Sequence, residues 1–187
     1  MISCYGEGAI IQGELENAIQ WLVDAGLVYK VYRAASPKVP LKFYRDIDAF
    51  KLYLLDVGLL GALSDAPAMQ MLVTNDVFKE FKGSFSENYV LQQLTNVPSL
   101  PVYYYSKDNS RLEIDFLVQI NDKVVPIEVK AEENVKGKSL AQFVKNEFGE
   151  EHLQGLRISM KPYIDQGWME NIPLYAVEFF FQQTMAE

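Results

Sequence analysis

Cysteine and histidine are almost absent from this 187-residue sequence, and each scarcity excludes a class of site. The single cysteine, Cys4, excludes a disulfide framework within the chain and is typical of a reducing compartment. Because His152 is the only histidine, the chain forms neither a histidine cluster for zinc nor a Ser-His-Asp set of its own. Any catalytic chemistry is therefore expected to use other side chains.

Long apolar runs and positive charge are also in short supply. No apolar run approaches the about 20 residues that cross a bilayer, and the first ten residues lack the pattern of a secretory signal. We therefore expect a cytoplasmic protein with no membrane partner. The chain has 17 Lys and Arg against 25 Asp and Glu, a net charge of −8, so binding to nucleic acid would require a local basic patch.

The first part of the chain carries such a patch. Residues 12–26 have apolar side chains on one face of a predicted helix, and strand-like runs follow at 27–34 and 41–45, which together predict a winged-helix-like segment. Six basic residues and two acidic ones between positions 30 and 51 give this stretch a charge of +4. We predict phosphate contacts from Lys30, Arg33, Lys38 and Lys42. The alternative is a solvated hairpin face without a partner.

With 49% hydrophobic residues, the chain has enough apolar side chains for a core. A short strand and a small helix are predicted over residues 50–63, and a longer helix over 83–95. Strands are then predicted at 101–107, 111–120 and 123–131, a helix at 138–149, and further strands at 155–161 and 172–181. This order predicts an α/β fold, a mixed sheet flanked by helices, with one unit at 1–75 and another at 76–187.

Three charged residues lie within the apolar strand runs. Glu128 and Lys130 are two apart, so they share a face of their strand, and Asp115 comes close to Glu128 if the two strands pair through the turn at 121–123. Two carboxylates can hold Mg²⁺ or Mn²⁺, the lysine can stabilise developing charge, and Glu87 offers a third carboxylate. We therefore expect Asp115, Glu128 and Lys130 to gather on one side of the sheet, with Glu87 facing them from its helix. The alternative is that Glu128 and Lys130 only pair with each other while Asp115 bonds locally.

The predicted order of helix, three strands, helix and strand resembles that of the PD-(D/E)XK nuclease superfamily. Asp115 matches the aspartate on the second strand, Glu128 and Lys130 match the Glu-x-Lys on the third, and Glu87 matches a helix glutamate of many members. Ile114 stands where the motif has proline. The resemblance implies a restriction-endonuclease-like fold, a catalytic set of Asp115, Glu128, Lys130 and Glu87, and metal ligation by Asp115 and Glu128.

Five segments between residues 14 and 178 also resemble the C-terminal domain of bacterial and archaeal AAA-type P-loop ATPases. This resemblance implies that the chain is the C-terminal part of a longer ATPase, with the ATPase module and DNA as partners. The alternative is a docking or regulatory domain that retains a nuclease fold without catalysis. We expect no ATP site in this chain, because its only Gly-Lys-Ser, at 137–139, lacks the P-loop glycine at the position of Glu132.

Overall fold

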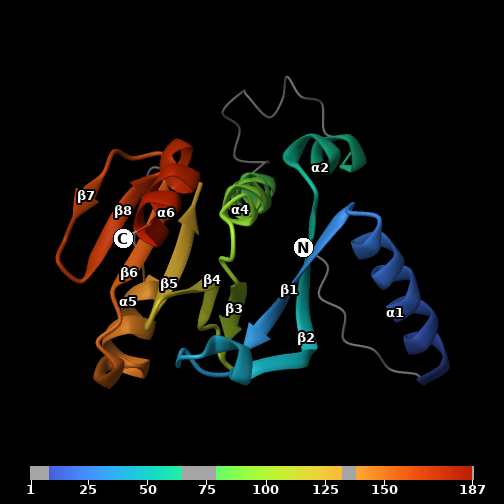
Figure 1. Ribbon diagram of the computed structural model, residues 1–187, viewed down its shortest axis with the longest axis horizontal. Helices are drawn as coiled ribbons and strands as arrows, with labels where there is room; N and C mark the ends of the chain where they lie inside the picture. Colours follow the sequence, from blue (N-terminus) through green and yellow to red (C-terminus); the bar gives the residue numbers. More distant parts are fainter. Residues whose placement is uncertain (1–8, 65–78, 132–137, 187) are drawn as a thin grey trace.

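The computed structural model describes residues 9–64, 79–131 and 138–186, and its centre is one mixed β-sheet. Across the described residues the strand order is β2-β1-β3-β4-β5-β6-β8-β7 (Figure 1). The strands are β1 (Val28–Ala34), β2 (Arg45–Leu54), β3 (Val102–Ser106), β4 (Glu113–Ile120), β5 (Lys123–Lys130), β6 (Gly155–Ser159), β7 (Ile164–Asp165) and β8 (Met169–Pro173). This mixed sheet flanked by helices confirms the predicted α/β fold class.

Helices cover both faces of the sheet. They are α1 (Ala9–Asp24), α2 (Val57–Leu63), α4 (Lys79–Thr95), α5 (Lys138–Ala141, continued by a π-helical turn over Gln142–Glu147) and α6 (Val177–Ala186). Leu91 of α4 and Phe181 of α6 pack with Phe116 and Ile127, and we call this cluster the α4-side core. Leu140 of α5 packs on the other face with residues such as Ile114 and Leu117, and we call this cluster the α5-side core.

The first helix and the strand at 27–34 form as predicted, but the prediction of a returning strand at 41–45 is wrong. The returning strand begins at Arg45, because residues Leu41–Tyr44 form a 3₁₀ turn, η1. Leu41 is fully buried in the α5-side core, and its N–H donates to the side chain of Gln119 at 3.0 Å, which fixes the turn. The strand then continues to Leu54.

The hairpin belongs to the same sheet as the later strands. β1 pairs antiparallel with β2 on one side and parallel with β3 on the other, where Arg33 lies opposite Tyr104. The expected division at about residue 75 falls within 65–78, outside the described residues. The hairpin and the predicted site are therefore attached to a common framework.

The prediction of a strand over residues 172–181 is wrong. β8 ends at Pro173, and residues Val177–Ala186 form α6 (Figure 1). Val177 and Phe181 are buried four residues apart, while Phe179 between them is exposed, which is the spacing of a helix rather than a strand. The aromatic run looked strand-like because phenylalanine is common in strands.

The described helices also bear on the membrane question. None of those within 9–64, 79–131 and 138–186 combines the length and apolar character needed to cross a bilayer.

Candidate functional site

Asp115 lies at an irregular point of β4. Ile114 packs into the α5-side core and Phe116 into the α4-side core, whereas strict alternation would put both on one face. The pairing with β3 shifts register over the same stretch, so β4 carries a bulge here. Its pairing with β5 ends at Phe116 opposite Ile127, and beyond that the Oδ2 of Asp115 accepts the N–H of Val129 at 2.7 Å. A carboxylate therefore takes the place of a backbone partner beside β5.

Glu128 and Lys130 flank Val129 on β5 and contact each other. Ile127 and Val129 belong to the α4-side core, so Glu128 and Lys130 project to the opposite face. The Nζ of Lys130 lies 2.9 Å from Oε1 of Glu128, which confirms that the two residues share a face and pair. Glu128 is only 3% exposed, and its Oε2 has no hydrogen-bond partner within the described part of the chain. A buried carboxylate oxygen without a partner is unusual.

Glu87 approaches the site from α4. Burial raises the pKa of Glu87, the positive charge of Lys51 opposes that rise, and the negative charge of Glu113 adds to it. The Oε2 of Glu87 is buried and also has no hydrogen-bond partner among the described residues. Helix α4 therefore presents a carboxylate that is costly to ionise.

Asp115 and Glu87 influence each other directly. Burial raises the pKa of Asp115 to about 7, and the negative charge of Glu87 contributes in the same direction. The hydrogen bond from Val129 and the charges of Lys51 and Lys130 lower this pKa but do not cancel the effect of burial. The pair resembles other buried carboxylates that share a region and cannot both ionise cheaply.

The four predicted site residues meet around the end of β5 in two groups. Asp115 interacts with Glu87, while alternation in β5 turns Glu128 toward the α5 side, so the expected gathering of all carboxylates on one face is not seen. Lys130 connects the groups, because its ammonium contacts Glu128 and its charge lowers the pKa of both Asp115 and Glu87. Within the described residues, no three side chains of His, Cys, Asp or Glu are arranged to hold a metal ion.

Sequence reasoning missed two residues that β2 contributes to this region. Lys51 is buried, forms an ion pair with Glu113, and its Nζ lies 4.8 Å from the centre of the Tyr104 ring. The Tyr53 hydroxyl is buried without a hydrogen-bond partner among the described residues, and burial and the charge of Glu87 raise its pKa well above the usual range. The sequence did contain a signal for Lys51, because it is a lysine inside the apolar run at 50–55. Lys130 was recognised as a candidate from the same kind of pattern.

The four predicted phosphate contacts have different surroundings. Arg33 bonds Asp46 at 2.7 Å and Asp108 at 2.5 Å, and the Nζ of Lys38 lies 3.2 Å from Glu151. Lys30 packs its ammonium 4.0 Å from the centre of the Phe50 ring, and Lys42 is exposed on η1. Acidic neighbours therefore engage Arg33 and Lys38, whereas Lys30 and Lys42 have no ion pair within the described residues.

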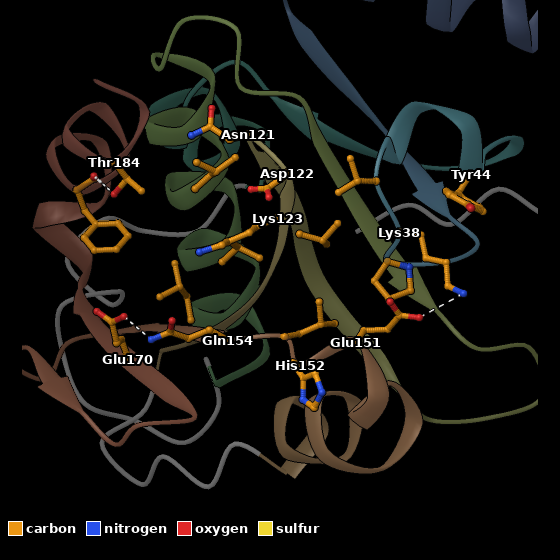
Figure 2. Close-up of a pocket in the computed structure, with 18 residues that line it drawn as sticks. Lys38, Tyr44, Asn121, Asp122, Lys123, Glu151, His152, Gln154, Glu170 and Thr184 are labelled. Carbon is orange, nitrogen blue, oxygen red and sulfur yellow. Dashed lines mark hydrogen bonds and ion pairs between the residues drawn. The ribbon is translucent and has the colours of Figure 1, made fainter. Parts of the chain in front are cut away.

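A cavity of about 920 Å³ lies at the other end of β4 and β5, around their connecting turn. Figure 2 shows Lys38 and Tyr44 on one side, Thr184 and Glu170 on the other, and Lys123 between them. The lining also includes His152, but none of the four predicted catalytic residues. This cavity is separate from the carboxylate site.

The architecture is that of an α/β protein in which one mixed sheet carries a charged site at the ends of β4 and β5. A domain of unknown function, DUF4143, matches residues 82–176, just over half of the chain, and the chain belongs to this family. A second domain of unknown function, DUF8612, matches residues 9–70. No curated protein and no solved structure matches the chain. Glu87, Asp115, Glu128 and Lys130 all lie within the DUF4143 match.

Proposed function

We propose that this chain is a nucleic-acid-directed module that hydrolyses phosphodiester bonds with Mg²⁺ or Mn²⁺ at the end of β5. One observation carries the proposal. The carboxylate of Asp115 bonds the N–H of Val129, the residue between Glu128 and Lys130, so an acid from β4 sits beside the Glu-x-Lys of β5. The resemblance of these residues to the PD-(D/E)XK pattern supports the same conclusion.

The side chains are suited to a divalent metal ion. Mg²⁺ is commonly held by one or two carboxylates, with waters and substrate phosphates completing the octahedron, so a third acidic ligand is not required. Asp115 and Glu128 face different sides of β5, but Asp115 bonds the N–H of Val129, the residue next to Glu128, so a metal ion at the end of β5 would be held by these two carboxylates. The buried Oε2 of Glu128 has no partner among the described residues. The metal would polarise the phosphodiester and lower the pKa of a bound water.

The remaining side chains have roles consistent with this chemistry. The side chain of Lys130 is 34% exposed, so it can reach a substrate, and its ammonium would stabilise charge that develops on the phosphate. Burial raises the pKa of Asp115 to about 7 and also raises that of Glu87, so metal binding would release a proton from Asp115 near neutral pH. The hairpin lysines Lys30 and Lys42 would guide the nucleic-acid backbone, and an ATPase module would be the partner that delivers it.

Three variants test the proposal in full-length protein with ATP and Mg²⁺ or Mn²⁺. Asp115→Asn and Glu128→Gln should each abolish cleavage and weaken Mn²⁺ binding, because each removes a metal ligand. Lys130→Ala should abolish cleavage while leaving Mn²⁺ binding nearly unchanged. Equal background cleavage by wild type and all three variants, across single-stranded, duplex and branched DNA and RNA, would contradict catalysis.

A second candidate function is a docking or regulatory domain without catalysis. Two observations favour it: the described residues contain no three-residue metal cluster, and acidic neighbours engage Arg33 and Lys38 of the basic hairpin. This candidate predicts that Asp115→Asn and Glu128→Gln leave the cellular activity of the full-length protein intact. Loss of that activity in both variants would favour the nuclease.

A further inference from the structure

Large aromatic side chains are exposed together at the outer edge of the sheet, next to the last helix. β7 is the outer strand beside β8 (Figure 1), and a groove of about 440 Å³ is lined by this pair of strands, by α6 and by the turn before α6. We call it the aromatic groove, and its main lining residues are Tyr163, Ile172, Pro173, Tyr175, Phe179 and Phe180. Tyr163 is 55% exposed, Tyr175 82% and Phe179 65%. Several large apolar side chains exposed at one place are typical of an interaction surface.

Two carboxylates lie at the rim of the aromatic groove. Ile172 is buried in the α4-side core with Phe181 of α6, and Glu170 shares its face of β8 because the two residues are two apart. Asp165 lies opposite Glu170 in the β7–β8 pair, so it shares this face as well. The hydroxyl of Tyr163 donates to Oε2 of Glu170 at 3.0 Å, which joins the rim to the aromatic lining.

These carboxylates have no cation beside them. Glu170 also accepts from Nε2 of Gln154 at 2.6 Å, and Asp165 accepts the N–H of Gly167 at 2.7 Å. All of these donors are neutral, and neither carboxylate forms an ion pair with a lysine or arginine in the part of the chain that the structure describes. An apolar groove beside unpaired negative charge complements a partner that carries both apolar and positively charged side chains.

Other occupants lack this positive charge. A second copy of the chain would bring a further charge of −8, and a symmetric pair would place the same carboxylates against each other. The segments at 1–8, 65–78 and 132–137 carry one lysine against five acidic residues. Nucleic acid and anionic lipid are negative themselves. A basic polypeptide segment is therefore the occupant that the charges favour.

We propose that the aromatic groove binds a basic, apolar segment of a partner protein. Large apolar side chains of that segment pack on Tyr175 and Phe179, while its lysine or arginine side chains reach Asp165 and Glu170. None of the four predicted catalytic residues lines the groove, so the proposal does not depend on nucleic-acid cleavage. It assigns a surface and a partner chemistry that neither candidate function specifies.

Three synthetic peptides of equal length test this chemistry by fluorescence anisotropy. The first has Phe and Leu flanked by lysines, the second has glutamates in place of the lysines, and the third has alanines in place of Phe and Leu. The first peptide should bind the wild-type chain at least about tenfold more tightly than either of the others, because it alone makes both kinds of contact. Equal binding of the first and third peptides, or no binding of the first at about 1 mM, would overturn the proposal.

Substitution of one exposed aromatic side chain tests whether binding occurs in the groove. Phe179→Ser should weaken binding of the first peptide by about tenfold or more, because it removes an apolar contact. Phe43→Ser is the matched control, since Phe43 is 84% exposed on η1, which connects β1 and β2 at the other end of the strand order. Both variants should keep Tm within about 2 °C of wild type, as expected for surface positions. Equal weakening by the two variants would contradict binding in the groove.

The charged rim has its own test. Asp165→Asn combined with Glu170→Gln should weaken binding of the first peptide by about fivefold or more and reduce its salt dependence, while each new side chain keeps an oxygen acceptor. Glu16→Gln combined with Asp24→Asn removes the same charge from α1 and should leave the affinity within about twofold of wild type. Equal weakening by the two pairs would show that the peptide responds only to net charge.

Two further measurements identify other occupants. Sedimentation should give the same oligomeric state for wild type and Phe179→Ser, and a wild-type dimer that Phe179→Ser dissociates would assign the groove to a second copy. Vesicles of phosphatidylcholine should not bind the chain, and binding that Phe179→Ser abolishes would assign the groove to a membrane surface. Either result would overturn the proposal of a basic protein segment.

Discussion

The side-chain amide of Asn88 in α4 forms a two-way hydrogen-bonded pair with the backbone of Leu54 at the end of β2. Its Oδ1 accepts the N–H of Leu54 at 2.9 Å, and its Nδ2 donates to the carbonyl of Leu54 at 3.1 Å. Asn88 is almost fully buried and thus acts as the missing strand neighbour of β2. This pair joins the part of the chain that matches DUF8612 to the part that matches DUF4143.

Replacing Asn88 with Ala should destabilise the fold by about 2–4 kcal/mol, because two backbone groups of Leu54 lose their partner in a buried position. Urea unfolding would measure the loss. Thr95→Ala, at the exposed end of the same helix, is the matched control and should change stability by less than about 1 kcal/mol. A loss in Asn88→Ala no greater than in the control would mean that water replaces the amide at little cost.

Asp115→Asn should stabilise the protein, and more so at high pH. The folded-state pKa of Asp115 is raised to about 7 from the ordinary 3.8, so between these values the folded wild type holds a proton that the unfolded chain releases. The protonated carboxyl of Asp115 therefore costs the wild-type fold nothing at low pH, and the fold loses stability as the pH rises toward 7 and the carboxyl must ionise. Asparagine is neutral throughout and keeps an oxygen for the N–H of Val129.

Thermal unfolding at pH 5 and pH 8 measures this effect. The Tm of Asp115→Asn minus that of wild type should be at least about 3 °C larger at pH 8, which corresponds to about 1 kcal/mol in a chain of this size. Glu147→Gln, at a partly exposed ion pair with Lys107, serves as a carboxylate control and should show no such increase. A difference independent of pH would contradict the raised pKa.

The sequence predicted the relation between Glu128 and Lys130 because strand alternation alone decides it. It did not predict where Asp115 points, because the bulge that separates Ile114 from Phe116 depends on pairing with β3, which no local pattern encodes. Strand positions between residues 102 and 130 agreed closely with the sequence pattern. The run at 172–181 misled because phenylalanine is common in strands, whereas the burial of Val177 and Phe181 has the spacing of a helix.

The surroundings of the site were the least predictable part. Lys51, Arg157 and Asn171 lie far from one another in the sequence, and only the order of strands in the sheet brings them near Asp115 or Glu128. A usable signal existed for Arg157, because it is the single basic residue within an apolar strand run at 155–159 and a buried charge requires a partner. Its partner could not be chosen without the sheet topology.

Replacing Tyr53 with Phe should leave stability unchanged or increase it. The hydroxyl of Tyr53 is buried without a hydrogen-bond partner among the described residues, while its ring packs 5.7 Å from the Phe116 ring, centre to centre. Phenylalanine keeps the packing and removes the unpaired polar group. Guanidinium unfolding would measure the change, with Tyr103→Phe as control. A loss above about 1 kcal/mol would indicate that the hydroxyl bonds water or a neighbour.

Binding of duplex DNA should weaken with salt, through Lys30 and Lys42 in particular. Each phosphate neutralised contributes about 0.9 to the slope of log affinity against log salt, so the double change of Lys30 and Lys42 to Ala should reduce that slope by about 1.8. Arg33→Ala should lower stability more than it changes the slope, because Asp46 and Asp108 already engage the guanidinium.

Fluorescence anisotropy with a labelled duplex at several salt concentrations would give the slopes. Lys161→Ala, which lies after β6 on another part of the sheet, removes one charge away from the hairpin and should leave the slope unchanged. If Lys161→Ala flattens the slope as much per charge as the hairpin variant, binding is not localised on the hairpin. Absence of duplex binding at low salt would favour the docking candidate.

Lys51→Met should destabilise the protein, and more strongly at pH 8 than at pH 5. The buried ammonium of Lys51 forms an ion pair with Glu113 and lowers the pKa of both Glu87 and Asp115, so its removal leaves three carboxylates without this nearby cation. At pH 5 a proton neutralises Asp115, whose pKa is raised to about 7, and the loss of Lys51 costs less. At pH 8 Asp115 is ionised and its negative charge is no longer offset by Lys51.

Urea unfolding at the two pH values measures how much Lys51→Met lowers the free energy of unfolding relative to wild type. This decrease should be larger at pH 8 than at pH 5 by about 1 kcal/mol or more, the equivalent of roughly one pKa unit. Lys107→Met is the matched control, because Lys107 forms an ion pair with Glu147 without contacting the site, and its effect should be small at both values. An equal loss for Lys51→Met at both pH values would show that the lysine stabilises β2 by packing on Tyr104 alone. A loss that grows with pH would instead mean that a residue from the hairpin sets the charge of Asp115 and Glu87, and that cleavage assays need the hairpin present.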